Sequence, residues 1–206
     1  MSKKEEVRKH LFSQIEKKDD LKYLIENLSE DEIYIAEYSI NNTSYLLKNI
    51  NFKTKTCIIE IRKNKERVAE TIPFDRNRVF TIYFSGEICF IPIDGKGLLK
   101  TANCDFVFFN EQNFCFVEMK LNATSTDERK IEDNRKNAVR QLQNTISYFD
   151  TKLSQNYSGL LLEAYIATPD IYPRENTAFQ SIKIQFLEET YVELFESREK
   201  RYLRGQ

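Results

Sequence analysis

The sequence is poor in the residue types on which many catalytic sites depend. Its 206 residues include one histidine, His10, which falls in a charged N-terminal segment that we interpret as a surface helix. A Ser-His or Cys-His mechanism therefore has almost no imidazole available. The cysteines form no CxxC pair and lie within or beside apolar runs, which argues against a zinc site and a disulfide scaffold. They are Cys57, Cys89, Cys104 and Cys115.

An excess of one charge is also missing. The 31 lysines and arginines nearly balance the 32 aspartates and glutamates, so the net charge is -1. Binding to phosphate would therefore have to use local basic patches or metal ions. No apolar run approaches the roughly 18 residues of a membrane span, and the start of the chain has no apolar signal-peptide core. We expect a cytoplasmic protein without a membrane partner.

The length and the hydrophobic content of 41% suit a sizeable core, in one domain or in one domain with an embellishment. The order of apolar patterns predicts a mixed α/β (α+β) fold. We expect helices and β-hairpins over residues 1–100, in the same domain as a core over residues 101–195. Residues 196–206 are expected to form a charged C-terminal tail.

Apolar spacing and capping signals give the expected elements in more detail. The predicted helices are 2–18, 20–28 and 125–149, the last opened by a capping box of Ser125 and Glu128. The segment 31–52 fits either a helix or strands. The predicted strands are 57–62, 67–72, 79–84, 88–93, 105–110, 114–121, 160–168, 182–186 and 191–195. We expect the first two of these strands to form one hairpin and the next two to form another.

The stretch 105–120 contains charges where the surrounding residues indicate buried sheet. A buried charge is costly unless a partner or a metal compensates for it. If Phe109 faces Phe114 across the turn, Asp105 lies opposite Glu118, with Cβ atoms about 4.5–5.5 Å apart. Lys120 follows Glu118 by two residues and leaves the strand on the same face. The register therefore predicts that three charged side chains converge.

Two carboxylates this close repel each other unless a cation lies between them. Oxygen ligands are what Mg²⁺ and Mn²⁺ prefer, so Asp105 and Glu118 are candidate metal ligands. Such a metal could activate water and neutralise charge on a phosphodiester, and Lys120 could stabilise the same charge. The structural alternative is a surface salt bridge between Asp105 and Lys120 at a sheet edge.

This pattern resembles the PD-(D/E)XK nucleases, the restriction-endonuclease-like superfamily. Their pattern is an acid at the start of one strand and acid-x-Lys at the end of its hairpin partner, in an α-β-β-β-α-β core. Asp105, then Glu118 and Lys120, then the helix 125–149 follow that order. Asp105 follows Cys104 and not a proline, a departure that is frequent in this superfamily. Other acid-x-Lys strings of the chain fall on predicted helices, loops or helix ends.

The resemblance also implies further site residues. Several branches carry a glutamine in the helix that follows; Gln141 matches best, with Tyr148 two turns later, and Gln143 is the rival. By resemblance, Gln141 would orient the water or contact the scissile phosphate, although a solvated helix position is the structural alternative. A metal-tuning glutamate on the first helix also occurs in the superfamily. The candidates here are Glu5, Glu6 and Glu26.

By resemblance, the chain would be an Mg²⁺- or Mn²⁺-dependent (endo)nuclease acting in defence or repair, with DNA favoured over RNA as the nucleic acid. Asp105, Glu118, Lys120 and Gln141 would be catalytic. Cleavage of both strands needs two sites, which favours a homodimer. Basic segments at 63–67 and 198–204 would contribute to recognition. Two alternatives remain: a catalytically silent relative that binds nucleic acid or a partner protein, and a hydrolase of another phosphodiester.

Overall fold

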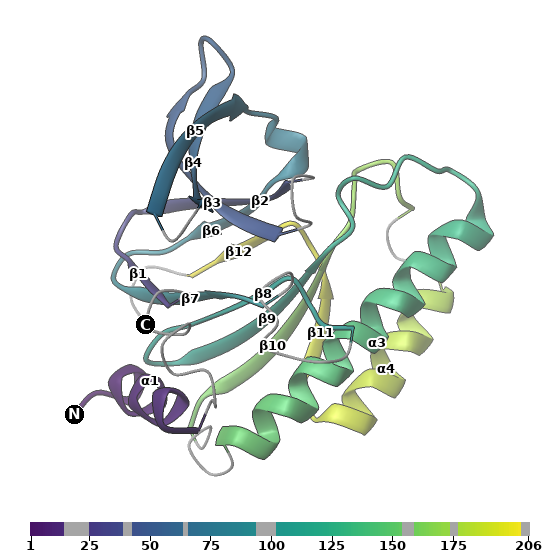
Figure 1. Ribbon diagram of the computed structural model, residues 1–206. Coiled ribbons are helices and arrows are strands. Elements are labelled where there is room, and N and C mark those ends of the chain that lie inside the picture. Colours follow the sequence, from purple (N-terminus) through teal and green to yellow (C-terminus); the bar gives the residue numbers. More distant parts are fainter. Residues whose placement is uncertain are drawn as a thin grey trace.

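The protein has three layers: helices, a central mixed sheet and a second mixed sheet (Figure 1). The computed structural model describes residues 1–14, 25–38, 43–63, 66–93, 102–153, 159–173 and 177–202. In spatial order, the central sheet contains β1 (Glu26–Leu28), β7 (Ile88–Pro92), β8 (Phe106–Phe109), β9 (Asn113–Met119), β10 (Leu161–Ala167) and β11 (Glu193–Glu196). The second sheet contains β12 (Glu199–Arg201), β6 (Phe80–Tyr83), β2 (Glu32–Tyr38), β3 (Thr43–Asn51), β4 (Thr56–Lys63) and β5 (Glu66–Pro73). The helices are α1 (Lys3–Gln14), the short 3₁₀ helix η1 (Arg76–Arg78), α3 (Glu128–Leu153) and α4 (Thr177–Thr190).

The helices gather on one face of the central sheet because of the order of its strands. The chain leaves β9 through α3 to reach the parallel neighbour β10, and leaves β10 through α4 to reach the parallel β11. Parallel crossovers are almost always right-handed, so two crossovers in the same direction place both helices on the same face. Val7 and Leu11 of α1 join the same core. The predicted mixed α/β class is confirmed.

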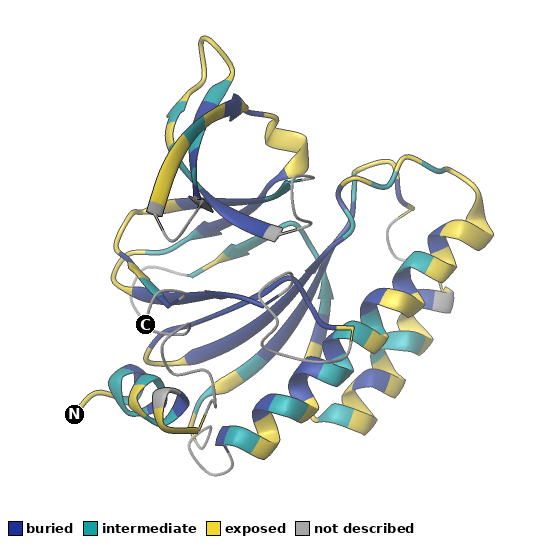
Figure 2. Ribbon diagram, viewed as in Figure 1, coloured by how far each residue is buried: buried dark blue, intermediate teal, exposed yellow. Residues whose placement is uncertain are grey.

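The hairpin β8–β9 is buried on both faces, as Figure 2 shows. Successive strand residues point to opposite faces. Phe109 and Phe114 therefore pack in the core beneath the helices, whereas Phe106 and Phe108 pack against the second sheet. Two covered faces explain why this part of the sequence is almost continuously apolar.

The C-terminal segment joins the two sheets. β11 pairs with β10, and β12 pairs with β6 in the second sheet. The Lys200 ammonium donates to both carboxylate oxygens of Glu163 on β10, at 2.7 and 2.5 Å. Part of the segment expected to be a charged tail is therefore a paired strand; residues 203–206 lie outside the described residues.

The structure confirms some predicted elements. The hairpin of β4 and β5 forms with Cys57 paired to Ile72, and the ambiguous segment 31–52 contains two strands, β2 and β3. The predicted long helix exists, but its first free amides are capped by Asp127, whose carboxylate accepts from Lys130 N at 3.1 Å. Ser125 instead accepts from Asp127 N. The helix therefore begins at Glu128 and ends at Leu153.

Two predicted elements are wrong. Residues 79–84 and 88–93 do not form a hairpin, because β6 pairs with β2 and β12 while β7 pairs with β1 and β8. Residues 182–186 are helical and belong to α4: Phe179 and Phe186 pack in the core, whereas Ile184, which fitted the strand alternation, is exposed. A short apolar run fits both periods, and packing decided between them.

The second predicted helix, 20–28, lies largely outside the described residues, and its described end, Glu26–Leu28, is strand β1. Residue 18, where the first helix was expected to end, is also outside them. The sheets do not follow the division at residue 100, because β1 and β7 come before it and β8 to β11 after it. No helix among the described residues has the length and apolarity needed to cross a lipid bilayer.

Candidate active site

The register of the central hairpin is the one that the sequence predicts. Phe109 pairs with Phe114 and Phe106 pairs with Val117, so the next position brings Asp105 opposite Glu118. Asp105 N donates to Val117 O at 3.0 Å, which extends the ladder to this point. The turn is held by Asn110, whose side-chain oxygen accepts from the backbone amides of residues 112 and 113, each at 2.8 Å.

The predicted site residues are brought together. Asp105 and Glu118 are both buried, with exposed fractions of 4% and 2%. The Lys120 ammonium donates to Glu118 Oε1 at 2.6 Å and to Gln141 Oε1 at 3.1 Å. Gln141 Nε2 in turn donates to Asn103 O at 2.8 Å. Glu118, the lysine and the glutamine therefore form one hydrogen-bonded cluster, with Asp105 opposite Glu118. The ion pair of Lys120 is with Glu118 and not with Asp105, the partner named in the structural alternative.

The cluster lies where two parallel strands end. Lys120 N donates to Ala167 O at 2.7 Å, so the end of β9 is bound to the end of β10. In open α/β sheets, ligands bind beyond the carboxyl ends of the strands. The position of the cluster in the fold is therefore one at which a substrate could approach.

Helix α3 brings Gln141 to the cluster. Ala138, Leu142 and Ile146 of α3 are buried in the core that also contains Phe114 and Phe116. Thr145 fixes the helix to the segment before β8, because its hydroxyl accepts from Cys104 N at 2.9 Å. The same hydroxyl donates to Gln141 O.

Burial and repulsion shape the electrostatics. Burial, and then the nearby Glu118 carboxylate, raise the pKa of Asp105 well above its usual range, although the Met119 backbone amide, which donates to Asp105 Oδ2 at 2.5 Å, acts against them. Burial alone would lower the pKa of Lys120, but the attraction and hydrogen bond of Glu118 outweigh it, and the pKa is raised. Asp105 is therefore costly to ionise and Lys120 stays charged.

The donor set suits a hard divalent cation. A cation between Asp105 and Glu118 would remove their repulsion, and carboxylate oxygens are its preferred ligands. Within the described ranges, no group of three or more His, Cys, Asp or Glu side chains is placed to hold a metal ion. Backbone carbonyls and water would therefore complete the coordination, as is usual for Mg²⁺.

A further acid near the cluster escaped prediction from the sequence. Glu37, on β2 of the second sheet, raises the pKa of both Asp105 and Lys120 through its charge. Asn122, in the turn after β9, donates to Glu37 Oε2 at 3.2 Å. No sequence signal connects β2 to this hairpin, because the contact arises only when the two sheets pack together.

Other candidates lie elsewhere. Gln143 Nε2 donates to Glu189 of α4, so the rival of Gln141 faces away from the cluster. Tyr148 packs against Phe149, with the Lys152 ammonium 5.8 Å from its ring.

The proposed first-helix glutamates are not at the cluster either. Glu5 and Glu6 make ion pairs with Arg8 and Lys3 on α1, which contacts the turn of the hairpin through Lys4 and Glu111. That turn is about 20 Å along β9 from Glu118. Glu26 pairs with Lys48 at 3.8 Å, and its backbone partner is Phe90 in the middle of β7.

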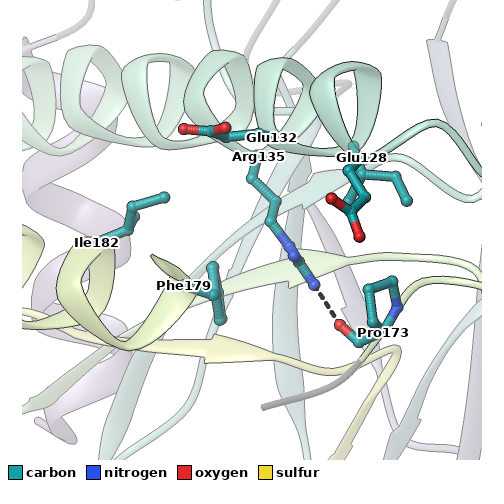
Figure 3. A pocket seen from close by; sticks show the side chains of 7 residues that line it. Glu128, Glu132, Arg135, Pro173, Phe179 and Ile182 are labelled. Atoms are coloured by element: carbon teal, nitrogen blue, oxygen red, sulfur yellow. Dashed lines mark hydrogen bonds between the residues drawn. The ribbon is translucent and has the colours of Figure 1, made fainter. Parts of the chain in front are cut away.

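A separate cavity of about 340 Å³ lies between α3 and α4 (Figure 3). Arg135 points into this region, but its guanidinium is already engaged by the Pro173 carbonyl at 2.7 Å and by both Glu196 oxygens at 2.9 Å. Phe179 lies against it, 4.9 Å from the ring centre to the guanidinium carbon. We interpret Arg135 as a structural residue that fixes α3.

Comparison of the chain with protein-family models, curated proteins and solved structures finds no match. A functional assignment therefore depends on the geometry of the cluster.

Proposed function

We propose that this protein is a divalent-metal-dependent nuclease of the PD-(D/E)XK type. The observation that carries the proposal is the convergence of Asp105, Glu118 and Lys120 at the buried end of the hairpin, with Gln141 contacting the lysine. The order α1, β7, β8, β9, α3, β10 supports it, because it corresponds to an α-β-β-β-α-β core in which β1 and the strands β2 to β6 of the second sheet lie between α1 and β7. DNA is the proposed substrate, and a homodimer would place two such sites on a duplex.

The residues have distinct proposed roles. Asp105 and Glu118 would hold Mg²⁺ or Mn²⁺, which supplies Lewis-acid stabilisation of the phosphodiester and lowers the pKa of water. The Met119 amide orients the Asp105 carboxylate. Lys120 places a fixed positive charge where negative charge develops on the phosphate. Gln141 positions the Lys120 ammonium through its amide oxygen, since its other end is bound to Asn103 O.

Cleavage of supercoiled DNA and of RNA by the purified protein with Mg²⁺ or Mn²⁺ tests the proposal. Glu118→Gln and Lys120→Gln should each lower the cleavage rate by on the order of 100-fold or more. The matched control is Glu132→Gln and Lys136→Gln, an exposed Glu–Lys pair on α3 at a similar separation of 2.7 Å. Equal rates in the site variants and the control variants would refute a nuclease role for this cluster.

Calorimetry separates the proposal from the silent alternative. We expect Mn²⁺ to bind the wild-type protein and to bind much more weakly after Asp105→Asn or Glu118→Gln. Mn²⁺ binding that is absent, or unaffected by both substitutions, would instead indicate a nuclease-like fold that binds a partner without cleaving it.

A further inference from the structure

A groove of about 570 Å³ lies next to the candidate active site. Its apolar lining, here called the floor, comes from strands of the second sheet and the segment after η1, and its polar lining is called the rim. The floor residues are Ala36, Leu47, Ile72, Pro73 and Val79. Its rim is polar and contains Glu37, Tyr38, Asp75, Arg78 and Asn122. The volume falls in the range of roughly 300–1,000 Å³ typical of small-molecule sites.

The groove and the acid cluster share a wall. Asn122 follows Lys120 by two residues, in a turn closed by a 3.0 Å hydrogen bond from Ala123 N to Lys120 O. The Asn122 amide binds Glu37 across the groove rim, and the Glu37 charge acts on both Asp105 and Lys120. A ligand in the groove would therefore lie near the acid cluster.

The chemistry of the groove suits a nucleobase. A base is flat and largely apolar on its faces, which fits the apolar floor and the ring of Tyr38, and it carries donors and acceptors on its edge. Asn122 offers both an amide donor and an amide acceptor, and Glu37 offers an acceptor.

A backbone phosphate of the bound strand could pair with Arg78, which also lines the groove. Arg78 is exposed, and its ion pair with Asp75 is loose, with 3.7 Å between Nε and Oδ2. Exposed pairs of this kind contribute little, so a phosphate can replace Asp75 as the partner of the guanidinium. Arg78 therefore offers a contact for the backbone of a strand whose base lies in the groove.

We propose that the groove receives an unpaired base adjacent to the scissile phosphate, so that single-stranded nucleic acid is bound in preference to a duplex. Bases inside a duplex are stacked and paired and cannot enter such a pocket without being flipped out. A preference for cleaving single strands would rest on the proposed nuclease function, whereas the preference for binding them does not.

Fluorescence anisotropy of a labelled single-stranded DNA oligonucleotide, and of the same sequence as a duplex, tests this in the Asp105→Asn background, in which no cleavage is expected. We expect the single strand to bind about tenfold or more tightly than the duplex. Tyr38→Ala should weaken single-strand binding by roughly tenfold and leave duplex binding unchanged, whereas Tyr38→Phe, which keeps the ring, should retain it. Tyr191→Ala, at the exposed end of α4, is the control and should bind as the parent does. Thermal unfolding of each variant identifies any loss of fold.

A second variant, Asn122→Ala, removes the amide and keeps the apolar floor, and it should weaken single-strand binding several-fold. Equal affinity for single strand and duplex, or unchanged single-strand affinity in both Tyr38→Ala and Asn122→Ala, would overturn the inference. Cleavage that depends on Glu118 without preference for single strands would leave the nuclease proposal standing and remove this one. Single-strand binding that depends on Tyr38, without any cleavage by the wild-type protein, would support the binding proposal and remove the nuclease proposal.

Discussion

Replacing Arg135 by methionine should strongly destabilise the protein. Arg135 and Glu196 have side-chain exposed fractions of 3% and 5%, and the guanidinium makes two 2.9 Å hydrogen bonds to the carboxylate and a third to the Pro173 carbonyl. The methionine keeps an apolar stem of similar length, but removes the charge and the guanidinium that lies over the Phe179 ring. Hydrogen bonds to charged groups contribute about 1.5–3 kcal/mol each, so the two bonds to Glu196 determine the size of the expected loss in unfolding free energy.

The expected loss in the free energy of unfolding is about 3–5 kcal/mol, because a buried carboxylate has lost its cation. Arg135→Lys keeps the charge but cannot form the two-pronged contact, so we expect roughly half of that loss. In the double variant Arg135→Met with Glu196→Leu, both charges of the buried pair are removed, so neither is left without its partner. It should therefore be more stable than Arg135→Met alone, although the Thr168 hydroxyl loses its acceptor on Glu196.

Urea unfolding followed by far-ultraviolet circular dichroism and tyrosine fluorescence measures these values, since the chain has no tryptophan and 11 tyrosines. A loss below about 1 kcal/mol for Arg135→Met would show that the pair contributes like a surface ion pair. The single variant Glu196→Leu completes the comparison. If the double variant loses as much unfolding free energy as Arg135→Met and Glu196→Leu lose together, the two charges are not coupled and the reasoning is refuted.

Three further outcomes follow from packing, backbone geometry and thiol burial. Phe114→Ala should cost about 3–5 kcal/mol of unfolding free energy, because the ring is fully buried, whereas Leu161→Ala on the neighbouring strand, more than half exposed, should cost about 0.5 kcal/mol or less by the same urea titration. Gly86→Ala should lower the thermal stability by about 1–3 kcal/mol, since its φ is +143° and an added Cβ would lie 3.0 Å from the Phe84 ring; an unchanged melting temperature would contradict this. Burial raises the pKa of the Cys89 thiol from the usual 9.0 to about 11, so the native thiol keeps its proton at pH values where the unfolded one loses it. Stability should therefore fall as pH rises from about 9 to about 11, and Cys89→Ala should reduce this slope.

The hairpin and its register could be predicted because local physics determines them. A strand pair that is buried on both faces leaves a continuous apolar run, against which Asp105 and Glu118 stand out as costly. The short polar turn then allows few registers, and Asn110 holds the one that aligns the acids. Gln141 could be located for a similar reason, since it borders the apolar stripe of α3 that must face β9.

Contacts between distant segments could not be predicted in this way. The strand pattern of residues 79–93 is correct, but which sheet each strand joins depends on the faces left open by the rest of the fold. Glu37 has no distinguishing feature in the sequence. It lies near the acid cluster only because β2 and β9 end at the same side of the packed sheets.

The second sheet has a structural role that also bears on function. Both crossovers, α3 and α4, cover one face of the central sheet, so Phe106, Phe108 and Val117 on the other face need a cover, which the second sheet provides through Ile33, Ile35 and Phe80. The sheet that completes the core thereby also builds the groove beside the cluster. The proposed chemistry depends on the hairpin, and the proposed choice of substrate depends on the second sheet. Substitutions in the hairpin should therefore change the cleavage rate on every substrate, and substitutions at Tyr38 or Asn122 should change the preference among substrates.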